Sequence, residues 1–231
     1  MRADGLSAEQ KTSVSDVVTA ADHAAEELVQ AALREARPDD AILGEEGAAK
    51  DGRSGRRWVI DPVDGTYNFF SGLPWWCSAL ALDAGDESLG AVHQPVTGET
   101  WVGGPSTPTT LDGVPVARLV ERPLSEISIA TYVHPPRLGE EDVRAGTDAL
   151  ISGAATMRIL GSGSCDLSAV AGGRLGAWAQ HTVPDWDWLP GQALVEGAGG
   201  RTAEIEHRGL RWCLASNGRA LDEMVDRLRA S

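Results

Sequence analysis

A strand-like run leads into two closely spaced carboxylates in the stretch Trp58-Val59-Ile60-Asp61-Pro62-Val63-Asp64-Gly65-Thr66. The run is aromatic and β-branched, and Pro62 lacks the N–H that a sheet ladder needs, so we expect the strand to end at Asp61. Asp61 and Asp64 flank a turn that proline stiffens and Gly65 releases, so their carboxylates can converge on one point. Hard divalent cations prefer such oxygen ligands, and the carbonyl of Val63, left unpaired by the turn, can be a further ligand.

The same stretch allows a second interpretation, in which Asp61 and Asp64 only shape the turn, as Asp-Pro and Asp-Gly pairs usually do. If a short helix begins near Thr66, its backbone N–H groups and its dipole favour an anion such as phosphate beside the carboxylates. Taken alone, the stretch leaves a structural turn and a site for a metal and an anion as alternatives.

Two other groups of acidic residues carry the same ambiguity. Gly44-Glu45-Glu46-Gly47 is either a solvated turn or a place where a ligand is presented and the backbone can approach closely. Pro184-Asp185-Trp186-Asp187 is either an exposed acidic segment or one in which burial of the tryptophan places the neighbouring carboxylates in a less hydrated environment. Each group is a weak indication by itself.

The order of helical and strand-like patterns predicts a mixed α/β fold. A helix is expected over 15–37, where apolar residues recur at helical spacing, Thr19 and Asp22 can form a capping box, and Pro38 ends the pattern. The proline-containing stretch 103–115 is expected to connect two halves of the chain. The other expected elements are strands at 41–43, 58–60, 76–82, 89–93, 128–133 and 157–160, a loop or hairpin at 48–57, and helices at 65–70, 140–151 and 165–171.

Composition narrows the choice of partners and compartment. With 34 Asp+Glu against 20 Lys+Arg in 231 residues, the net charge of −14 argues against nucleic acid or an anionic membrane as the main partner. No apolar run reaches membrane-spanning length and the start is not signal-like, which favours a cytoplasmic protein. Cys77, Cys165 and Cys213 lack disulfide or metal spacing, so we expect reduced, buried thiols.

The acidic motifs, taken in order, resemble the signature of the inositol monophosphatase family, the magnesium-dependent, lithium-sensitive phosphomonoesterases. The resemblance covers nearly the whole chain from Ser13 onward, and the ordered set is far more specific than any one of its members. The matching segments are Asp16-Val17-Val18-Thr19-Ala20-Ala21-Asp22, Gly44-Glu45-Glu46, Trp58 to Phe69, Gly161-Ser162, and Trp186-Asp187 running to Ala198-Gly199-Gly200.

This resemblance implies roles for individual residues. The implied ligands of two or three Mg²⁺ ions are Glu45, Asp61, the carbonyl of Val63, Asp64 and Asp187. Thr66, oriented by Asp22 and with Glu45 nearby, is similar to the hydroxyl that helps to activate the attacking water. The implied substrate contacts are the backbone of Gly65 and Thr66 for the phosphate, and Gly161, Ser162, Gly163 and Gln180 for the alcohol portion.

We therefore expect a layered αβαβα sandwich of two subdomains, 1–115 and 116–231, with the active site in the cleft between them. The resemblance implies a homodimer and Mg²⁺-dependent hydrolysis of a small phosphorylated polyol. Inositol monophosphate is the first candidate, and histidinol phosphate, fructose 1,6-bisphosphate and 3′-phosphoadenosine 5′-phosphate are the alternatives. An alternative of another class is a catalytically idle, metal-binding regulator, against which the complete set of site residues argues.

Several positions depart from the family pattern. Gln180 stands where many relatives place a glutamate, and an amide cannot pair ionically with an ammonium group, which disfavours histidinol phosphate unless Asp185 or Glu196 takes over. The segment before Asp22 is short. Residues 11–15 stand where the family has a mobile loop that closes over the site, and this sequence has few residues for it. This weakens the expectation of a third metal position. Pro190 can sit in the first turn of the helix that follows Asp187.

Overall fold

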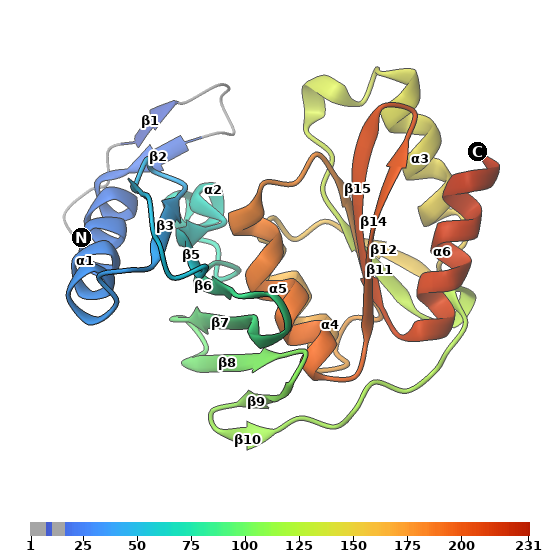
Figure 1. Ribbon diagram of the computed structural model, residues 1–231. Helices are drawn as coiled ribbons and strands as arrows, with labels where there is room; N and C mark the ends of the chain where they lie inside the picture. Colours follow the sequence, from blue (N-terminus) through green and yellow to red (C-terminus); the bar gives the residue numbers. More distant parts are fainter. Residues whose placement is uncertain (1–7, 11–16) are drawn as a thin grey trace.

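Five layers of helices and sheets alternate across the molecule, which the computed structural model describes over residues 8–10 and 17–231 (Figure 1). The helices are α1 (Ala20–Ala36), α2 (Thr66–Ser71), α3 (Glu141–Ile151), α4 (Gly163–Ala171), α5 (Asp185–Gly197) and α6 (Gly218–Ala230). α1 packs on the outer face of an eight-stranded sheet, α4 and α5 lie between this sheet and a five-stranded sheet, and α3 and α6 cover the far side. The predicted αβαβα sandwich is confirmed.

The eight-stranded sheet brings the first acidic motifs together. Its order is β10-β9-β8-β7-β6-β5-β3-β4, and β3 and β5 are parallel, with Gly44 opposite Ile60. Glu45, which follows β3, therefore lies beside Asp61 of β5. The strands are β3 (Ala41–Gly44), β4 (Ala49–Lys50), β5 (Arg57–Asp64), β6 (Cys77–Asp83), β7 (Leu89–Gln94), β8 (Glu99–Gly104), β9 (Thr107–Leu111) and β10 (Val114–Pro115).

A second sheet of five strands has the order β12-β11-β13-β15-β14, in which β11 is parallel to both of its neighbours. A separate antiparallel pair joins β1 (Ala8–Gln10) and β2 (Val17–Thr19). The five strands are β11 (Ser128–Thr131), β12 (Thr156–Arg158), β13 (Ala177–His181), β14 (Arg201–His207) and β15 (Leu210–Ser216), and short 3₁₀ turns cover Gly85–Glu87, Leu124–Glu126 and Pro135–Arg137.

The central helices are apolar on nearly all sides, because each of them meets a sheet on both faces. Trp188 of α5 is fully buried and stacks on Trp178 of β13 at 5.6 Å between ring centroids, and its Nε1 donates to Glu204 Oε1 at 3.0 Å. All three cysteines are free and buried, as expected. Dense packing of this kind fixes the first turn of α5, which carries Asp187. Within the described residues, we find no helix with the length and apolarity that a bilayer crossing requires.

Strand β5 does not end at Asp61 as expected. It continues through Pro62 to Asp64, and its register with β6 shifts between Asp61 and Asp64. Because proline removes one ladder donor, the strand accommodates it with an irregularity and not with a stop. Both Asp61 and Asp64 are buried at this irregularity.

Three other expectations about elements were wrong. Stretch 103–115 is not a connection, because it forms the end of β8 and the strands β9 and β10, and proline is tolerated at such a sheet edge. The first helix begins at Ala20 and not at residue 15, because strand β2 precedes it. The predicted capping box and the loop at 11–15 depend on parts that lie outside the described residues, namely the side chain of Thr19 and residues 11–16. Pro190 lies in the second turn of α5, since that helix already begins at Asp185.

Candidate active site

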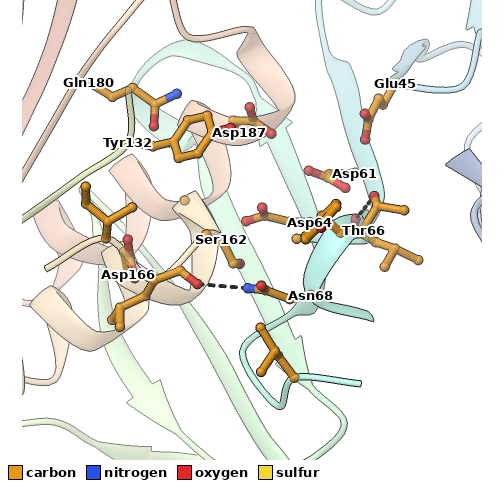
Figure 2. Close-up of a pocket in the computed structure, with 18 residues that line it drawn as sticks. Glu45, Asp61, Asp64, Thr66, Asn68, Tyr132, Ser162, Asp166, Gln180 and Asp187 are labelled. Carbon is orange, nitrogen blue, oxygen red and sulfur yellow. Dashed lines mark hydrogen bonds between the residues drawn. The ribbon is translucent and has the colours of Figure 1, made fainter. Parts of the chain in front are cut away.

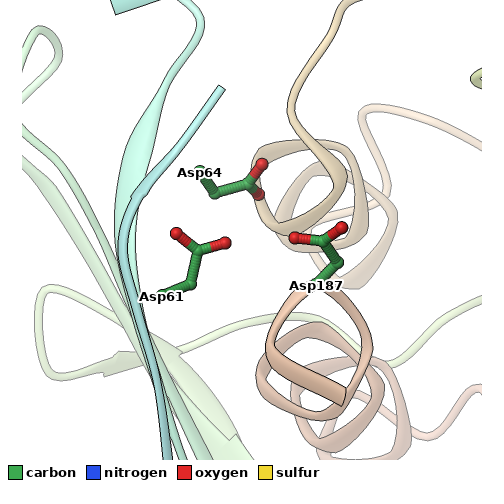
Figure 3. A group of neighbouring side chains, drawn as sticks. All are labelled: Asp61, Asp64 and Asp187. Atoms are coloured by element: carbon green, nitrogen blue, oxygen red, sulfur yellow. The ribbon is translucent and has the colours of Figure 1, made fainter. Parts of the chain in front are cut away.

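Three carboxylates from distant parts of the chain meet between the two sheets. Asp61 and Asp64 come from the irregular end of β5, and Asp187 comes from the first turn of α5. Each offers an oxygen atom within 4.8 Å of the other two, and all three side chains point to a common centre (Figure 3). The convergence that the sequence predicted for Asp61 and Asp64 is therefore present, and Asp187 joins it.

Burial and mutual repulsion make this cluster electrostatically strained without a cation. Burial raises the pKa of Asp61 well above its ordinary value, and the charges of Asp64, Glu45 and Asp187 raise it further. Burial also raises the pKa of Asp64, against the opposing effect of the Ser164 N–H, which donates to its Oδ2. Among the described residues, neither buried oxygen of Asp61 has a hydrogen-bond donor. Oxygen-only ligands in this state fit a hard divalent cation.

Glu45 faces the cluster from the turn after β3. Its backbone N–H donates to the carbonyl of Ile60 at 3.1 Å, which places it one position from Asp61 across the sheet. Its side chain lines the same pocket, and Figure 2 shows the carboxylate directed toward Asp61. The solvated-turn interpretation of this motif therefore does not account for where Glu45 points.

Thr66 lies at the start of α2, where Gly65 adopts φ 89° and caps the helix. Its hydroxyl lies 3.1 Å from Asp22 Oδ1 and 2.8 Å from the carbonyl of Val63. Because a hydroxyl has one proton, these two hydrogen bonds are alternatives for the donor. The expectation that the Val63 carbonyl is unpaired was wrong, although a carbonyl keeps a second lone pair for another partner.

A cavity of about 510 Å³ opens next to the carboxylates and takes its walls from both halves of the chain (Figure 2). Every predicted site residue lines it except Asp22, which is fully buried behind Thr66. The lining residues are Glu45, Asp61, Val63, Asp64, Gly65, Thr66, Tyr67, Asn68, Leu73, Tyr132, Ile159, Leu160, Gly161, Ser162, Gly163, Asp166, Gln180 and Asp187.

Segment 161–163 is held against the β5–α2 segment across the cavity. Asn68 Nδ2 donates to the carbonyls of Trp75 and Leu160, both at 2.8 Å. Gly161 has φ 90°, and a Cβ there would lie 2.9 Å from Asn68 Nδ2, so glycine is required for this close approach. Ser162 caps α4 by accepting from Cys165 N–H at 3.3 Å. The two halves are thus tied together at the site.

Asp185 and Glu196 do not replace Gln180 in the cavity. Asp185 forms an ion pair with Arg57 at 2.9 Å, and Glu196 accepts from Thr202 Oγ1. Gln180 of β13 does line the cavity, so the amide is the group that the site presents there.

Sequence reasoning gave no role to four polar residues of the cavity wall, Tyr67, Asn68, Tyr132 and Asp166. Asp166 is 2% exposed, and its Oδ1 accepts from Trp75 Nε1 at 2.8 Å. Burial raises its pKa to about 8, against the effect of this hydrogen bond, and the charge of Asp64 contributes. The sequence did carry a signal for Asp166, because it is the single acid in a predicted helix of small and apolar residues. It carried no such signal for Tyr132.

The site combines carboxylates that can hold hard cations with a helix start and a polar cavity. Comparison with known proteins identifies the chain as a phosphoric monoester hydrolase. The chain belongs to the inositol monophosphatase family, whose sequence model matches residues 1–229. Membership implies the use of a divalent metal, for which the buried acidic cluster provides a place.

Relatives in this family carry different names. The chain is 32% identical over 200 residues to the inositol-1-monophosphatase of Rhizobium meliloti (84% of this chain and 74% of the relative) and 32% identical over 223 residues to the histidinol-phosphatase of Mycobacterium tuberculosis (92% and 85%). It is 30% identical over 236 residues to the Nus factor SuhB of Haemophilus influenzae (99% and 88%). The solved structure of the Thermotoga maritima IMPase is similar with a TM-score of 0.82 and 28% identity, covering 97% of this chain and 87% of that one.

Proposed function

We propose that this phosphatase is a Mg²⁺-dependent hydrolase of a small phosphorylated polyol, with inositol monophosphate as the first candidate. The observation that carries the proposal is Asp61, a fully buried carboxylate with no donor among the described residues and two other acids beside it. Such a group is costly to bury without a cation.

The metal would be held by one set of oxygen atoms, from Glu45, Asp61, the carbonyl of Val63, Asp64 and Asp187. The chemistry that Mg²⁺ supplies when bound is charge neutralisation at the phosphate and a lower pKa of the attacking water. A phosphate monoester dianion repels an attacking anion, so both contributions are needed. We propose two or three ions per site, following the family resemblance.

Thr66 and Asp22 would prepare the water. When the Thr66 hydroxyl donates to Asp22, its oxygen is free to accept a hydrogen bond from a water molecule, which fixes the orientation of that water. Asp22 is fully buried and has no access to the cavity, so it acts through Thr66. Glu45 lies on the same side and would receive the proton.

The rest of the cavity would bind the ester. The backbone of Gly65 and Thr66 would meet the phosphate, and Gly161, Ser162, Gly163 and Gln180 would approach the alcohol. A volume of about 510 Å³ suits a small organic phosphate. The Gln180 amide can bond hydroxyl groups but cannot pair ionically with an ammonium group, which favours a polyol over histidinol phosphate.

A panel of esters tests this proposal. Phosphate release is measured from inositol 1-phosphate, histidinol phosphate, fructose 1,6-bisphosphate and 3′-phosphoadenosine 5′-phosphate, each with and without Mg²⁺, with Asp61→Asn as the inactive control. Mg²⁺-dependent release that is fastest for inositol 1-phosphate is the expected result. Faster release from another ester would select that alternative, and silence across the panel from folded, Mg²⁺-binding protein would favour a regulator.

Organisation beyond the site is also proposed. Subdomains 1–115 and 116–231 are suggested by the two sheets, of which the first ends at Pro115 and the second begins at Ser128. Phe70, Leu73 and Ile159 expose apolar side chains near the cavity, a surface that a homodimer could cover. Sedimentation of the protein at several concentrations measures the oligomeric state. The free, buried cysteines support a cytoplasmic location.

A further inference from the structure

Glu26 is a buried acid that the proposed chemistry does not use. It lies one helical turn after Asp22 on the same face of α1, and it is 4% exposed. Its two carboxylate oxygens accept one backbone hydrogen bond each, from Glu46 N–H at 2.9 Å and from Ala48 N–H at 2.7 Å. Bonds of this charge-assisted type offset the cost of burying the carboxylate and fix the backbone that donates them.

The donors belong to the turn at residues 44–48, which carries Glu45. Gly44 N–H donates to the Ala48 carbonyl at 2.7 Å, and Glu45 N–H donates to the Ile60 carbonyl at 3.1 Å. The Gly44 N–H thus closes the turn on itself, strand β5 anchors the Glu45 N–H, and Glu26 supplies the acceptors for two further N–H groups. A Cβ on Gly44 would lie 2.2 Å from Glu26 Oε2, so the carboxylate sits directly against the backbone of the turn.

We propose that Glu26 is a positioning residue for Glu45: its buried carboxylate holds the turn at residues 44–48 in the shape that directs Glu45 toward Asp61 and Thr66. The inference rests on the proposed function, in which Glu45 binds metal and stands beside the attacking water. Without Glu26, the Glu46 and Ala48 N–H groups lose their acceptors, the turn loosens, and Glu45 samples positions away from the cluster.

The test compares Glu26→Gln with Glu27→Gln, a matched change at an exposed position of the same helix. An amide presents an NH₂ group to one of the two backbone donors, so at least one hydrogen bond is lost. For Glu26→Gln we expect kcat on the best ester of the panel, and calorimetric Mg²⁺ affinity, to fall by about 10- to 100-fold, with KM little changed. Amide exchange at Glu46 and Ala48 should accelerate selectively, and Glu27→Gln should match the wild type in each measurement.

A double-mutant cycle with Glu45→Gln separates positioning from a merely structural role. If Glu26 acts through Glu45, then Glu26→Gln should reduce kcat by less than about twofold when Glu45 is already glutamine. An equal loss on both backgrounds, wild-type kcat in Glu26→Gln, or unchanged exchange at Glu46 and Ala48 would each overturn the inference. If Glu26→Gln does not fold, Glu26→Asp serves in its place, because it keeps the charge and shortens the side chain, which moves the carboxylate away from the Glu46 and Ala48 N–H groups.

Failure of the proposed function gives a different result from failure of this inference. Full activity of Glu45→Gln alone would remove Glu45 from the chemistry and overturn both. A strongly reduced kcat of Glu45→Gln together with a fully active Glu26→Gln would overturn only the positioning role.

Discussion

The acidic side of the cavity, formed by Glu45, Asp61, Asp64 and Asp187, contrasts with its alcohol side, formed by Tyr132, Ile159, Asp166 and Gln180. On the acidic side, burial and mutual repulsion raise the pKa of Asp61 and Asp64, and the charges converge. On the alcohol side, Gln180 is an amide, Ile159 is apolar, and burial raises the pKa of Asp166 to about 8, which favours its neutral form. In the proposed function, the acidic side would hold the cations and the phosphate, and the alcohol side would meet the leaving group.

The two sides are built in the same way. Glu45 and Asp61 are set by the adjacent parallel strands β3 and β5. Tyr132 and Gln180 are set by the adjacent parallel strands β11 and β13, because Thr131 lies opposite Ala179. Each side is completed by an acid from a packed helix, Asp187 of α5 and Asp166 of α4. The sides therefore differ in chemistry and not in construction, and we expect changes on the acidic side to affect the reaction as a whole and changes on the alcohol side to affect the choice of substrate.

Asp61→Asn should have the largest effect. We expect kcat/KM to fall by at least about a hundredfold, because even residues that only orient metal ligands contribute up to that much. Without metal, the variant should be more stable than the wild type at pH 8. The raised pKa of Asp61 means that the wild type loses stability as pH rises above the ordinary carboxyl value, and asparagine removes this loss.

Thermal unfolding with EDTA and with Mg²⁺ measures both consequences of Asp61→Asn. Mg²⁺ should raise the melting temperature of the wild type and leave that of the variant unchanged, since a ligand stabilises only the state that binds it. A variant that keeps Mg²⁺-dependent turnover would remove Asp61 from the metal site.

Asp22→Ala and Thr66→Val should come next. Each removes one partner of the hydrogen bond between Asp22 and Thr66, and we expect kcat to fall by about 10- to 100-fold in both, with no further loss in the double variant. If Asp22 only caps α1, its removal should instead cost about 1 kcal/mol of stability and leave turnover intact. Steady-state kinetics beside thermal unfolding distinguishes these outcomes, with Thr66→Ser as the control that keeps the hydroxyl.

How much the sequence predicts follows from this same contrast. The convergence of Asp61 and Asp64 could be predicted because both lie on one short turn around Pro62. Glu45 and Asp187 were ambiguous as isolated motifs and were assigned by their order along the chain. Tyr132 was not predicted, because it reaches the site through the parallel pairing of β11 with β13, two strands far apart in the sequence, and β13 was not assigned.

Some errors came from local signals with more than one meaning. Pro108 and Pro115 suggested a connection at 103–115, yet both lie in strands near the edge of a sheet, where proline is tolerated. Strands β13 and β15 were not assigned, because a continuous apolar run does not distinguish a doubly covered strand from a buried helix. Glu26 had a usable signal, since helical spacing places it with Asp22 and Leu33 on the buried face of α1.

Gln180→Glu should change the choice of substrate and not the reaction. A carboxylate at this place can pair with an ammonium group, so we expect KM for histidinol phosphate to fall by about tenfold and KM for inositol 1-phosphate to change less. Calorimetric Mg²⁺ affinity should stay at the wild-type level, and Gln30→Glu on α1 controls for the added charge. Equal changes for both esters would mean that residue 180 does not contact the alcohol portion.

Asp166→Asn should have the smallest effect, which is on stability as a function of pH. The pKa of Asp166 rises from 3.8 to about 8 on folding, so the folded chain keeps a proton that the unfolded chain has released. The free energy of unfolding of the metal-free protein therefore falls as pH rises through this interval. Asparagine stays neutral and its oxygen can still accept from Trp75 Nε1, so the variant should equal the wild type in stability near pH 4 and exceed it by a margin that grows up to about pH 8, with a higher Tm. Asp61 and Asp64 titrate in both proteins, so the difference between the two unfolding curves reports Asp166 together with its coupling to Asp64. A constant difference across pH would show that Asp166 is ionised in the folded protein, and the alcohol side would then carry a negative charge at pH 7 and select cationic alcohols.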